Sequence, residues 1–96
     1  MTSDAAEVAP KIVKVLFEND RIRVLDFKFK KGDKTAQHSH PANFVYALET
    51  GKFTSVAPGG KSTTVKMEKG ESSFSEANTH AVEYLSSGEL LQVELK

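Results

Sequence analysis

Three histidines are the residues of this 96-residue chain with the clearest capacity for chemistry. His38 and His40 stand two positions apart, and His80 follows far down the chain. Side chains two apart on an extended strand point to the same face, so His38 and His40 can aim at one point. Imidazole suits zinc, copper, nickel and iron, and three histidine ligands leave coordination positions open for water or substrate. The spacing predicts a divalent-metal site to which His80 contributes from a different strand.

The same residues also fit a purely structural role, because a bare His-x-His pattern is loose. In that alternative, His38 and His40 are exposed strand residues and His80 is a hydrogen-bonded core residue. The chain contains no cysteine, which excludes disulfides, thiolate ligands and cysteine nucleophiles. Any chemistry must therefore come from histidine, carboxylates, hydroxyls or a bound ion.

Short strands must position these histidines. Turn-forming residues recur at 18–20, 31–33, 50–51, 58–60, 69–70 and 86–88. The segments between them are rich in β-branched and aromatic residues and predict strands at 12–17, 21–29, 44–48, 53–57, 62–67 and 90–95. No segment sustains a helical period. Many short, evenly spaced strands favour an all-β sandwich or barrel.

Length and composition indicate one soluble domain. We expect a flexible N-terminal tail at 1–10 and a β-barrel domain at 11–96. The formal net charge is zero, which argues against nucleic acid or an anionic membrane as partner. No secretory signal or membrane-spanning apolar run is visible. We therefore expect a cytoplasmic protein.

Around the histidines, the sequence resembles the cupins, and specifically the short single-domain cupins. Their first motif, G-x5-H-x-H-x3-E-x6-G, is matched by Gly32, His38, His40 and Gly51. Phe44 takes the place of the motif's glutamate, which is usually a metal ligand in the family.

The second cupin motif is matched less well. Gly70 and His80 fit it, whereas Glu76 stands at its proline and Tyr84 at its asparagine. The resemblance extends from about Ile12 to the end of the chain. It implies a jelly-roll β-barrel, a double-stranded β-sandwich with the metal held in its mouth.

The implied function is binding of one divalent transition metal, with Fe, Zn, Ni, Mn or Cu open as its identity. Three neutral imidazoles leave the charge of the ion uncompensated, which favours an anionic guest. Similar three-histidine cupins include iron-dependent thiol and diketone dioxygenases. The sequence leaves two classes open: an enzyme acting on a small polar or anionic molecule, as a dioxygenase, isomerase or lyase, or a non-catalytic module that binds metal or a small ligand.

Neighbouring residues offer further candidates. Tyr46 shares the parity of the histidines, so we expect it to point inward as a phenolic hydrogen-bond donor or acid, with core filling as its alternative role. Phe44 has the same parity and is expected to form an apolar wall near the ion, with plain core packing as its alternative role. Asn43 is a candidate weak ligand. Glu76 and Glu83 are candidate bases or partners of His80, with a solvated surface position as the alternative.

Two further expectations concern surfaces. Gln37 has the opposite parity to His38 and His40, so we expect it to face outward. The apolar first strand at 12–17 would be left exposed on a chain this short. We therefore expect a homodimer in which this strand pairs with, or packs on, a partner sheet.

Overall fold

The computed structural model describes residues 5–96, apart from the side chain of residue 7. This part of the chain forms one short helix and nine strands. Their bounds are α1 Ala5–Val8, β1 Val13–Glu18, β2 Ile22–Phe29, β3 Lys34–His40, β4 Asn43–Glu49, β5 Gly51–Val56, β6 Ser62–Met67, β7 Ser72–Ser75, β8 Asn78–Tyr84 and β9 Gly88–Leu95. The six predicted strands are all present, and β3, β7 and β8 complete the set.

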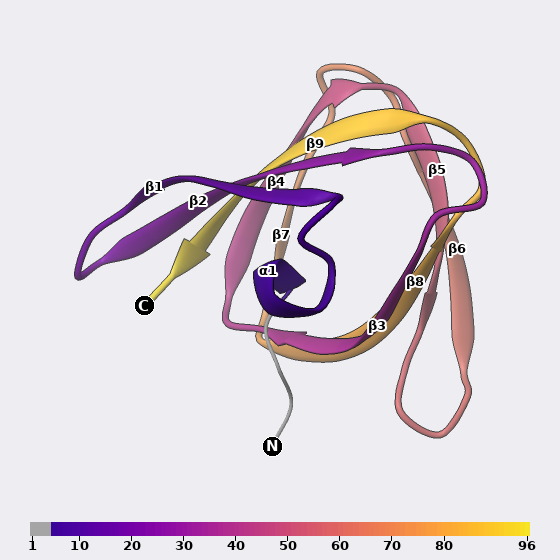
Figure 1. The fold of residues 1–96 in the computed structure, drawn as a ribbon, viewed down its shortest axis with the longest axis horizontal. Coiled ribbons are helices and arrows are strands. Elements are labelled where there is room, and N and C mark those ends of the chain that lie inside the picture. Colours follow the sequence, from indigo (N-terminus) through magenta and orange to yellow (C-terminus); the bar gives the residue numbers. More distant parts are fainter. Residues whose placement is uncertain (1–4) are drawn as a thin grey trace.

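The strands form two antiparallel sheets that face each other around one interior (Figure 1). One sheet has the order β1-β2-β9-β4-β7, and the other has the order β3-β8-β5-β6. Chain neighbours such as β3 and β4 lie in different sheets, whereas β2 pairs with β9 from the far end of the chain. The predicted all-β barrel is therefore confirmed.

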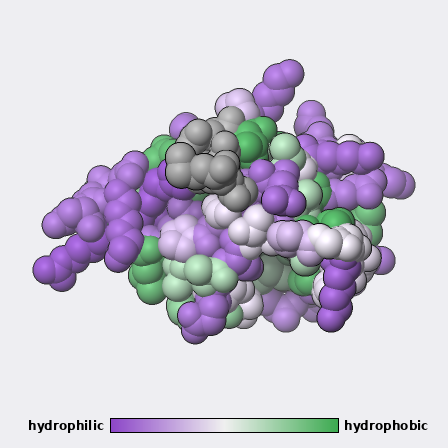
Figure 2. Space-filling view, turned by 90° about the horizontal axis from the view of Figure 1, so that it is seen from below, coloured by the Kyte–Doolittle hydropathy of each residue, from purple (hydrophilic) through white to green (hydrophobic). Residues whose placement is uncertain are grey.

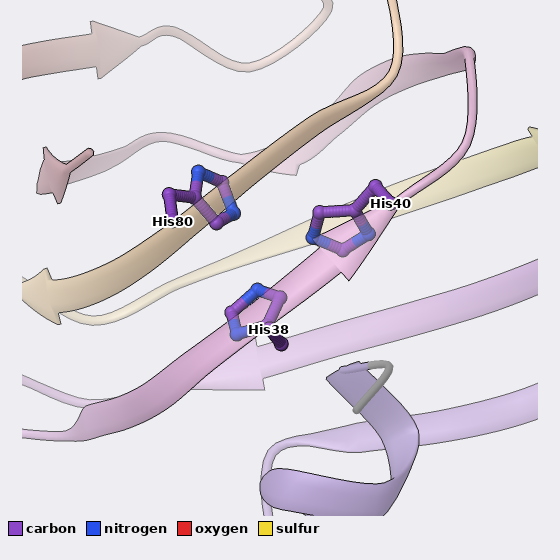
Figure 3. Close-up of side chains that lie close together, drawn as sticks. All are labelled: His38, His40 and His80. Carbon is purple, nitrogen blue, oxygen red and sulfur yellow. The ribbon is translucent and has the colours of Figure 1, made fainter. Parts of the chain in front are cut away.

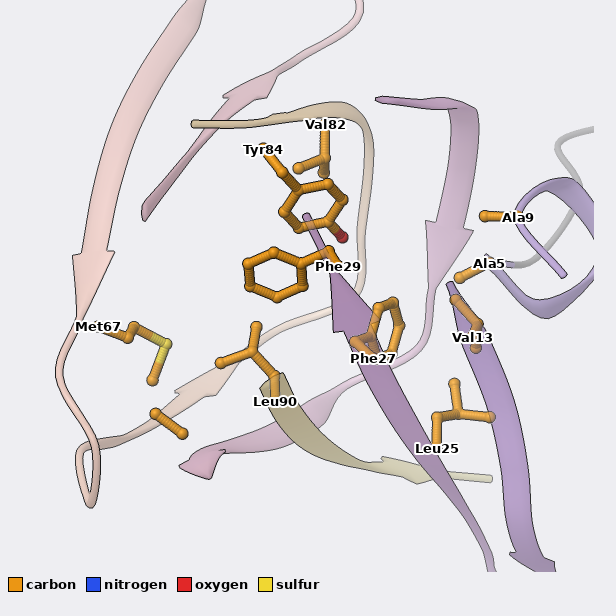
Figure 4. Close-up of a cluster of buried hydrophobic side chains, with 11 residues drawn as sticks. Ala5, Ala9, Val13, Leu25, Phe27, Phe29, Met67, Val82, Tyr84 and Leu90 are labelled. Carbon is orange, nitrogen blue, oxygen red and sulfur yellow. The ribbon is translucent and has the colours of Figure 1, made fainter. Parts of the chain in front are cut away.

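The core lies between the sheets (Figure 4). On β2, alternate residues Leu25, Phe27 and Phe29 are buried, as expected for a strand with one covered face. Phe29 stacks on Tyr84 of β8 with ring centroids 4.0 Å apart. Gly51 sits against the Phe29 ring, where an added Cβ would lie 2.7 Å from Cζ. This close approach, rather than a positive φ, explains the glycine at the end of the first motif.

The described part of the predicted tail, residues 5–10, already packs against the barrel, although the sequence predicts a domain that begins at residue 11. Residues 1–4 of the predicted tail lie outside the described residues. Ala5 and Ala9 are buried and belong to the hydrophobic core cluster. Within residues 5–96, no helix has the length and apolar character that a membrane span requires.

Candidate metal centre

Strand register brings two of the histidines face to face. His38 on β3 lies directly opposite His80 on β8, and His40 lies opposite Asn78. The register between Thr35 and His38 is irregular, because β3 carries one more residue than β8 over this stretch. Such a bulge changes which side chains face inward. Thr35, His38 and His40 are all buried, whereas Gln37 is exposed, as its parity predicts.

The three imidazoles form one compact cluster in the barrel (Figure 3). One ligand atom from each of His38, His40 and His80 lies within 4.8 Å of the other two. Ring centroids are 4.7 Å apart for His38–His40, 4.7 Å for His38–His80 and 5.1 Å for His40–His80, with the rings nearly perpendicular. The structure thus brings together the residues that the sequence selects, in an arrangement compatible with a metal site.

Hydrogen bonds engage the same ring nitrogen on all three histidines. His38 Nδ1 donates to the Ala36 carbonyl oxygen at 2.8 Å, and His40 Nδ1 donates to Glu94 Oε2 at 2.9 Å. His80 Nδ1 is 2.9 Å from Ser55 Oγ. Carbonyl and carboxylate oxygens only accept, which assigns the Nδ1–H tautomer to His38 and His40 and leaves the lone pair on Nε2. Tautomers fixed in this way are typical of metal-binding histidines.

A buried carboxylate supports His40, and sequence reasoning missed it. Glu94 on β9 is 2 % exposed and also accepts hydrogen bonds from Arg23 Nε at 2.9 Å and Nη2 at 2.7 Å. Burial alone would raise the pKa of Glu94, but hydrogen bonds from His40 and Arg23 and the positive charge of Arg23 hold it below its ordinary value. The available signal was the alternation on β9, where Leu90, Gln92 and Glu94 share one face.

The environment of His80 disfavours its charged form. Burial is the largest cause, and the neighbouring His38 and His40 add to it, so the pKa of His80 falls from 6.5 to about 4. A neutral imidazole is the form that binds metal, because protonation would occupy the lone pair. The fold therefore keeps His80 ready to act as a ligand well below neutral pH.

The lowered pKa of His80 predicts acid sensitivity of the metal-free protein. Between pH 6.5 and about 4, the unfolded chain binds a proton at His80 that the folded chain does not. The free energy of unfolding should therefore decrease as the pH is lowered from 6.5 to about 4. The expected decrease is roughly 1–2 kcal/mol, after allowance for solvent screening of a half-buried group. Urea unfolding from pH 7 to 4.5 measures the change. The His80→Ala variant should lose this part of the slope, and equal slopes in both proteins would contradict the assignment.

A cavity of about 60 Å³ adjoins the histidine cluster. Its remaining lining is mostly apolar and comes from both sheets: Phe27, Val45, Phe53, Val82, Tyr84, Leu90 and Gln92. A larger hollow of about 610 Å³ lies elsewhere and contains none of the histidines. Its rim carries lysines together with Asp33, Glu49 and Glu89, so its electrostatic potential is neither uniformly positive nor uniformly negative. The small cavity is the candidate ligand space.

The inward orientation predicted for Phe44 and Tyr46 is wrong. Both lie on the outer face of β4, with exposed fractions of 42 % and 40 %. The chain passes from one sheet to the other at Pro41 and Ala42, so the parity of β3 does not continue into β4. The odd-numbered Asn43 and Ala47 point inward instead. Neither Phe44 nor Tyr46 lines the cavity beside the histidines.

The other polar candidates fall into two groups. Asn43 is buried but uses its side chain to bind Pro41 and Gln92, so it is a partner within the core rather than a member of the histidine cluster. Glu76 and Glu83 are exposed. Both glutamates therefore occupy the solvated surface positions expected as the alternative to a role beside His80. Glu83 makes a solvent-exposed ion pair with Lys34.

No protein-family model and no curated protein matches the chain. Solved structures do. A cupin domain from Bordetella pertussis Tohama I is 27 % identical, with a TM-score of 0.76 over 88 % of this chain and 92 % of that one. A cupin superfamily protein from Desulfitobacterium hafniense DCB-2 is 16 % identical, with a TM-score of 0.67 over 88 % and 75 %. An RmlC-like cupin with a double-stranded β-helix fold, from Methanocaldococcus jannaschii, is 14 % identical, with a TM-score of 0.68 over 88 % and 78 %.

Proposed function

Because this chain is a small single-domain cupin, we propose that it binds one divalent transition-metal ion through His38, His40 and His80. The observation that carries the proposal is the proximity of the three rings, each with a ligand atom within 4.8 Å of the other two. Nδ1 is hydrogen-bonded on each ring, and on His38 and His40 it carries the proton, so that Nε2 would be the ligand atom of these two. Three imidazoles of this kind fit Fe, Zn, Ni, Mn or Cu. They do not by themselves select among these ions.

Glu94 adds a negative charge behind this ligand set. Its carboxylate touches His40, which strengthens that imidazole as a donor to an ion. Arg23 neutralises much of the same charge. The ion would therefore keep most of its positive charge toward the cavity, which supports a small polar or anionic guest.

We propose that the guest is a substrate and that the protein is a metal-dependent enzyme of dioxygenase, isomerase or lyase type. With three protein ligands, a bound ion keeps positions open and supplies Lewis-acid activation of a coordinated molecule. The surrounding side chains are mostly apolar, and a guest that fills the cavity would displace water and strengthen electrostatic interactions inside it. His38 and His40 are held by their Nδ1 bonds and orient the site.

A non-catalytic binding module is the second candidate, and the composition of the cavity favours it. Among the described residues that line the cavity, none is a carboxylate or a lysine. Tyr84 lines it, but burial, followed by the charge of Asp33, raises the pKa of its phenol well above the ordinary value. General acid–base catalysis near neutral pH would therefore depend on the histidines or on the guest itself.

The test is elemental analysis of protein grown with all five metals available, followed by titration of the metal-free protein with each ion. We expect about one ion per chain and a stabilised fold on binding. Oxygen uptake with small thiols and diketones then separates a dioxygenase from a binding module. Metal-free protein that also fails to bind any added ion would overturn the proposal.

A further inference from the structure

Gln92 carries a buried acceptor atom, and its side chain lines the cavity beside the histidines. Its side chain is 6 % exposed and belongs to the lining of that cavity. Its Oε1 atom has no hydrogen-bond partner among the described residues. A buried amide oxygen without a partner is unfavourable, so a group that donates to it from the cavity would be stabilised.

The orientation of the Gln92 amide is fixed by a chain of hydrogen bonds that ends on the backbone. Asn43 Nδ2 donates to the Pro41 carbonyl oxygen at 2.9 Å, and Gln92 Nε2 donates to Asn43 Oδ1 at 3.0 Å. The carbonyl can only accept, so Asn43 cannot be turned over without losing this bond. Asn43 therefore presents its Oδ1 as an acceptor to Gln92, and the NH2 group of Gln92 must be the donor of this hydrogen bond. The oxygen of Gln92 is left facing away from Asn43.

We infer that Gln92 Oε1 accepts a hydrogen bond from the molecule bound at the histidine cluster, and that this site selects ligands bearing an O–H or N–H group beside their metal-binding atoms. The inference rests on the proposed metal site. It narrows the guest from any small polar or anionic molecule to one that is also a hydrogen-bond donor. Ligands that only accept leave Gln92 Oε1 unsatisfied and bind more weakly.

A matched pair of probes tests this selection. Formohydroxamate chelates a metal through two oxygens and keeps an N–H donor, whereas its N-methyl derivative lacks that donor. Calorimetry with the zinc-loaded protein should show about tenfold preference for the N–H form, the size expected from one buried hydrogen bond. In Gln92→Met, which keeps the volume and loses the acceptor, the preference should fall below about twofold. The control Gln37→Met makes the same change at an exposed glutamine and should behave like wild type.

The outcomes separate this inference from the proposed function. Wild-type protein that binds no zinc would remove both. Zinc binding with the same probe preference in wild type and Gln92→Met, or with no hydroxamate binding at all, would overturn only the role of Gln92. Loss of zinc affinity itself in Gln92→Met would also overturn it, since Gln92 would then contact the ion and not its guest.

A different observation concerns the outer face of the five-stranded sheet. One apolar row crosses all five strands, because the pairing places Phe17, Val24, Val93, Phe44 and Phe74 side by side in that order. On the three central strands, β2, β9 and β4, the residues next to the row are buried, so the row points outward: Leu25, Gln92, Glu94 and Asn43. Its three phenylalanines are 42–56 % exposed.

Further apolar side chains widen this row. Leu91 pairs with Tyr46, and Leu95 pairs with Ile22 on the same outer face. The exposed rings and Leu95 together present roughly 500 Å² of apolar surface, at the upper end of what a monomer shows as its largest patch. By contrast, the face seen in Figure 2, from below in Figure 1, carries separate small hydrophobic areas among hydrophilic side chains.

We propose that this outer face, the row and its flanking residues, packs against the same face of a second copy of the chain. With its polar rim, the patch approaches the area of about 800 Å² per partner that stable interfaces bury. A two-fold axis lying in the plane between the two faces places the row of one copy against the row of the other, as an isologous interface requires. The formal net charge of zero means that two copies do not repel each other. The first strand contributes through Phe17.

Sedimentation velocity over a series of concentrations tests the interface. Wild type should sediment as a dimer and Phe44→Lys/Phe74→Lys as a monomer, with both binding zinc equally. Thr64→Lys places the same charge at an exposed position of the other sheet and should remain dimeric. Monomeric wild type, or a dimer that the double substitution leaves intact, would overturn this interface.

Discussion

Replacing His80 with alanine is expected to lower the affinity for a divalent ion at least about 100-fold, because the site loses one of three ligands. His80 lies on the accessible side of the cluster and is only half-buried, whereas His38 and His40 are buried. Truncation at position 80 should therefore leave the barrel folded. Calorimetric titration of metal-free protein with Zn²⁺ or Co²⁺ measures the change.

Two comparisons make the His80 result specific. Ser55→Ala removes only the partner of His80 Nδ1 and should weaken binding by a smaller factor, about tenfold, because the ring is less well oriented. Gln37→Ala alters an exposed residue on β3 and should have no effect. If His80→Ala kept wild-type affinity while folded, the three histidines would not share an ion, and the proposed chemistry would have to be abandoned.

The His38–His40 pair could be predicted because its determinants are local, and the resemblance to the second cupin motif supplied His80. Period-two spacing places His38 and His40 on one face of a strand, and the motif glycines mark the neighbouring turns. The orientation of Tyr46 could not be predicted in this way. Two residues at the corner between β3 and β4 move the chain to the other sheet, and counting parity along the sequence cannot register that change.

The residues that support the cluster were harder to predict, because they come from strands that pair only in the folded chain. Glu94 meets His40 across a separation of 54 residues, and Gln92 meets Asn43 across 49. Their positions on β9 carry a weak signal, since polar residues alternate into the buried face of that strand. On sequence alone, the same alternation is typical of an exposed strand face. Only the pairing of β9 with β2 and β4 decides between the two.

Replacing Arg23 with methionine is expected to lower the free energy of unfolding by about 3 kcal/mol, because Glu94 would remain buried beside His40 without its strongest counter-charge. For a domain of this size, that loss corresponds to a fall of about 15 °C in melting temperature. The pKa of Glu94 should rise at the same time, since the hydrogen bonds and charge that lower it come in part from Arg23. Urea unfolding and carboxyl NMR titration measure the two effects.

The double variant Arg23→Met/Glu94→Gln distinguishes a charge effect from lost packing. Neutralising Glu94 removes the uncompensated charge, so the double variant should be more stable than Arg23→Met alone, whereas lost packing around the arginine stem would persist. Lys34→Met breaks an exposed ion pair with Glu83 and should change stability by less than about 1 kcal/mol. A double variant no more stable than Arg23→Met would show that Arg23 acts through packing. Glu94 would then hold His40 without needing the arginine, and the metal site would tolerate its loss.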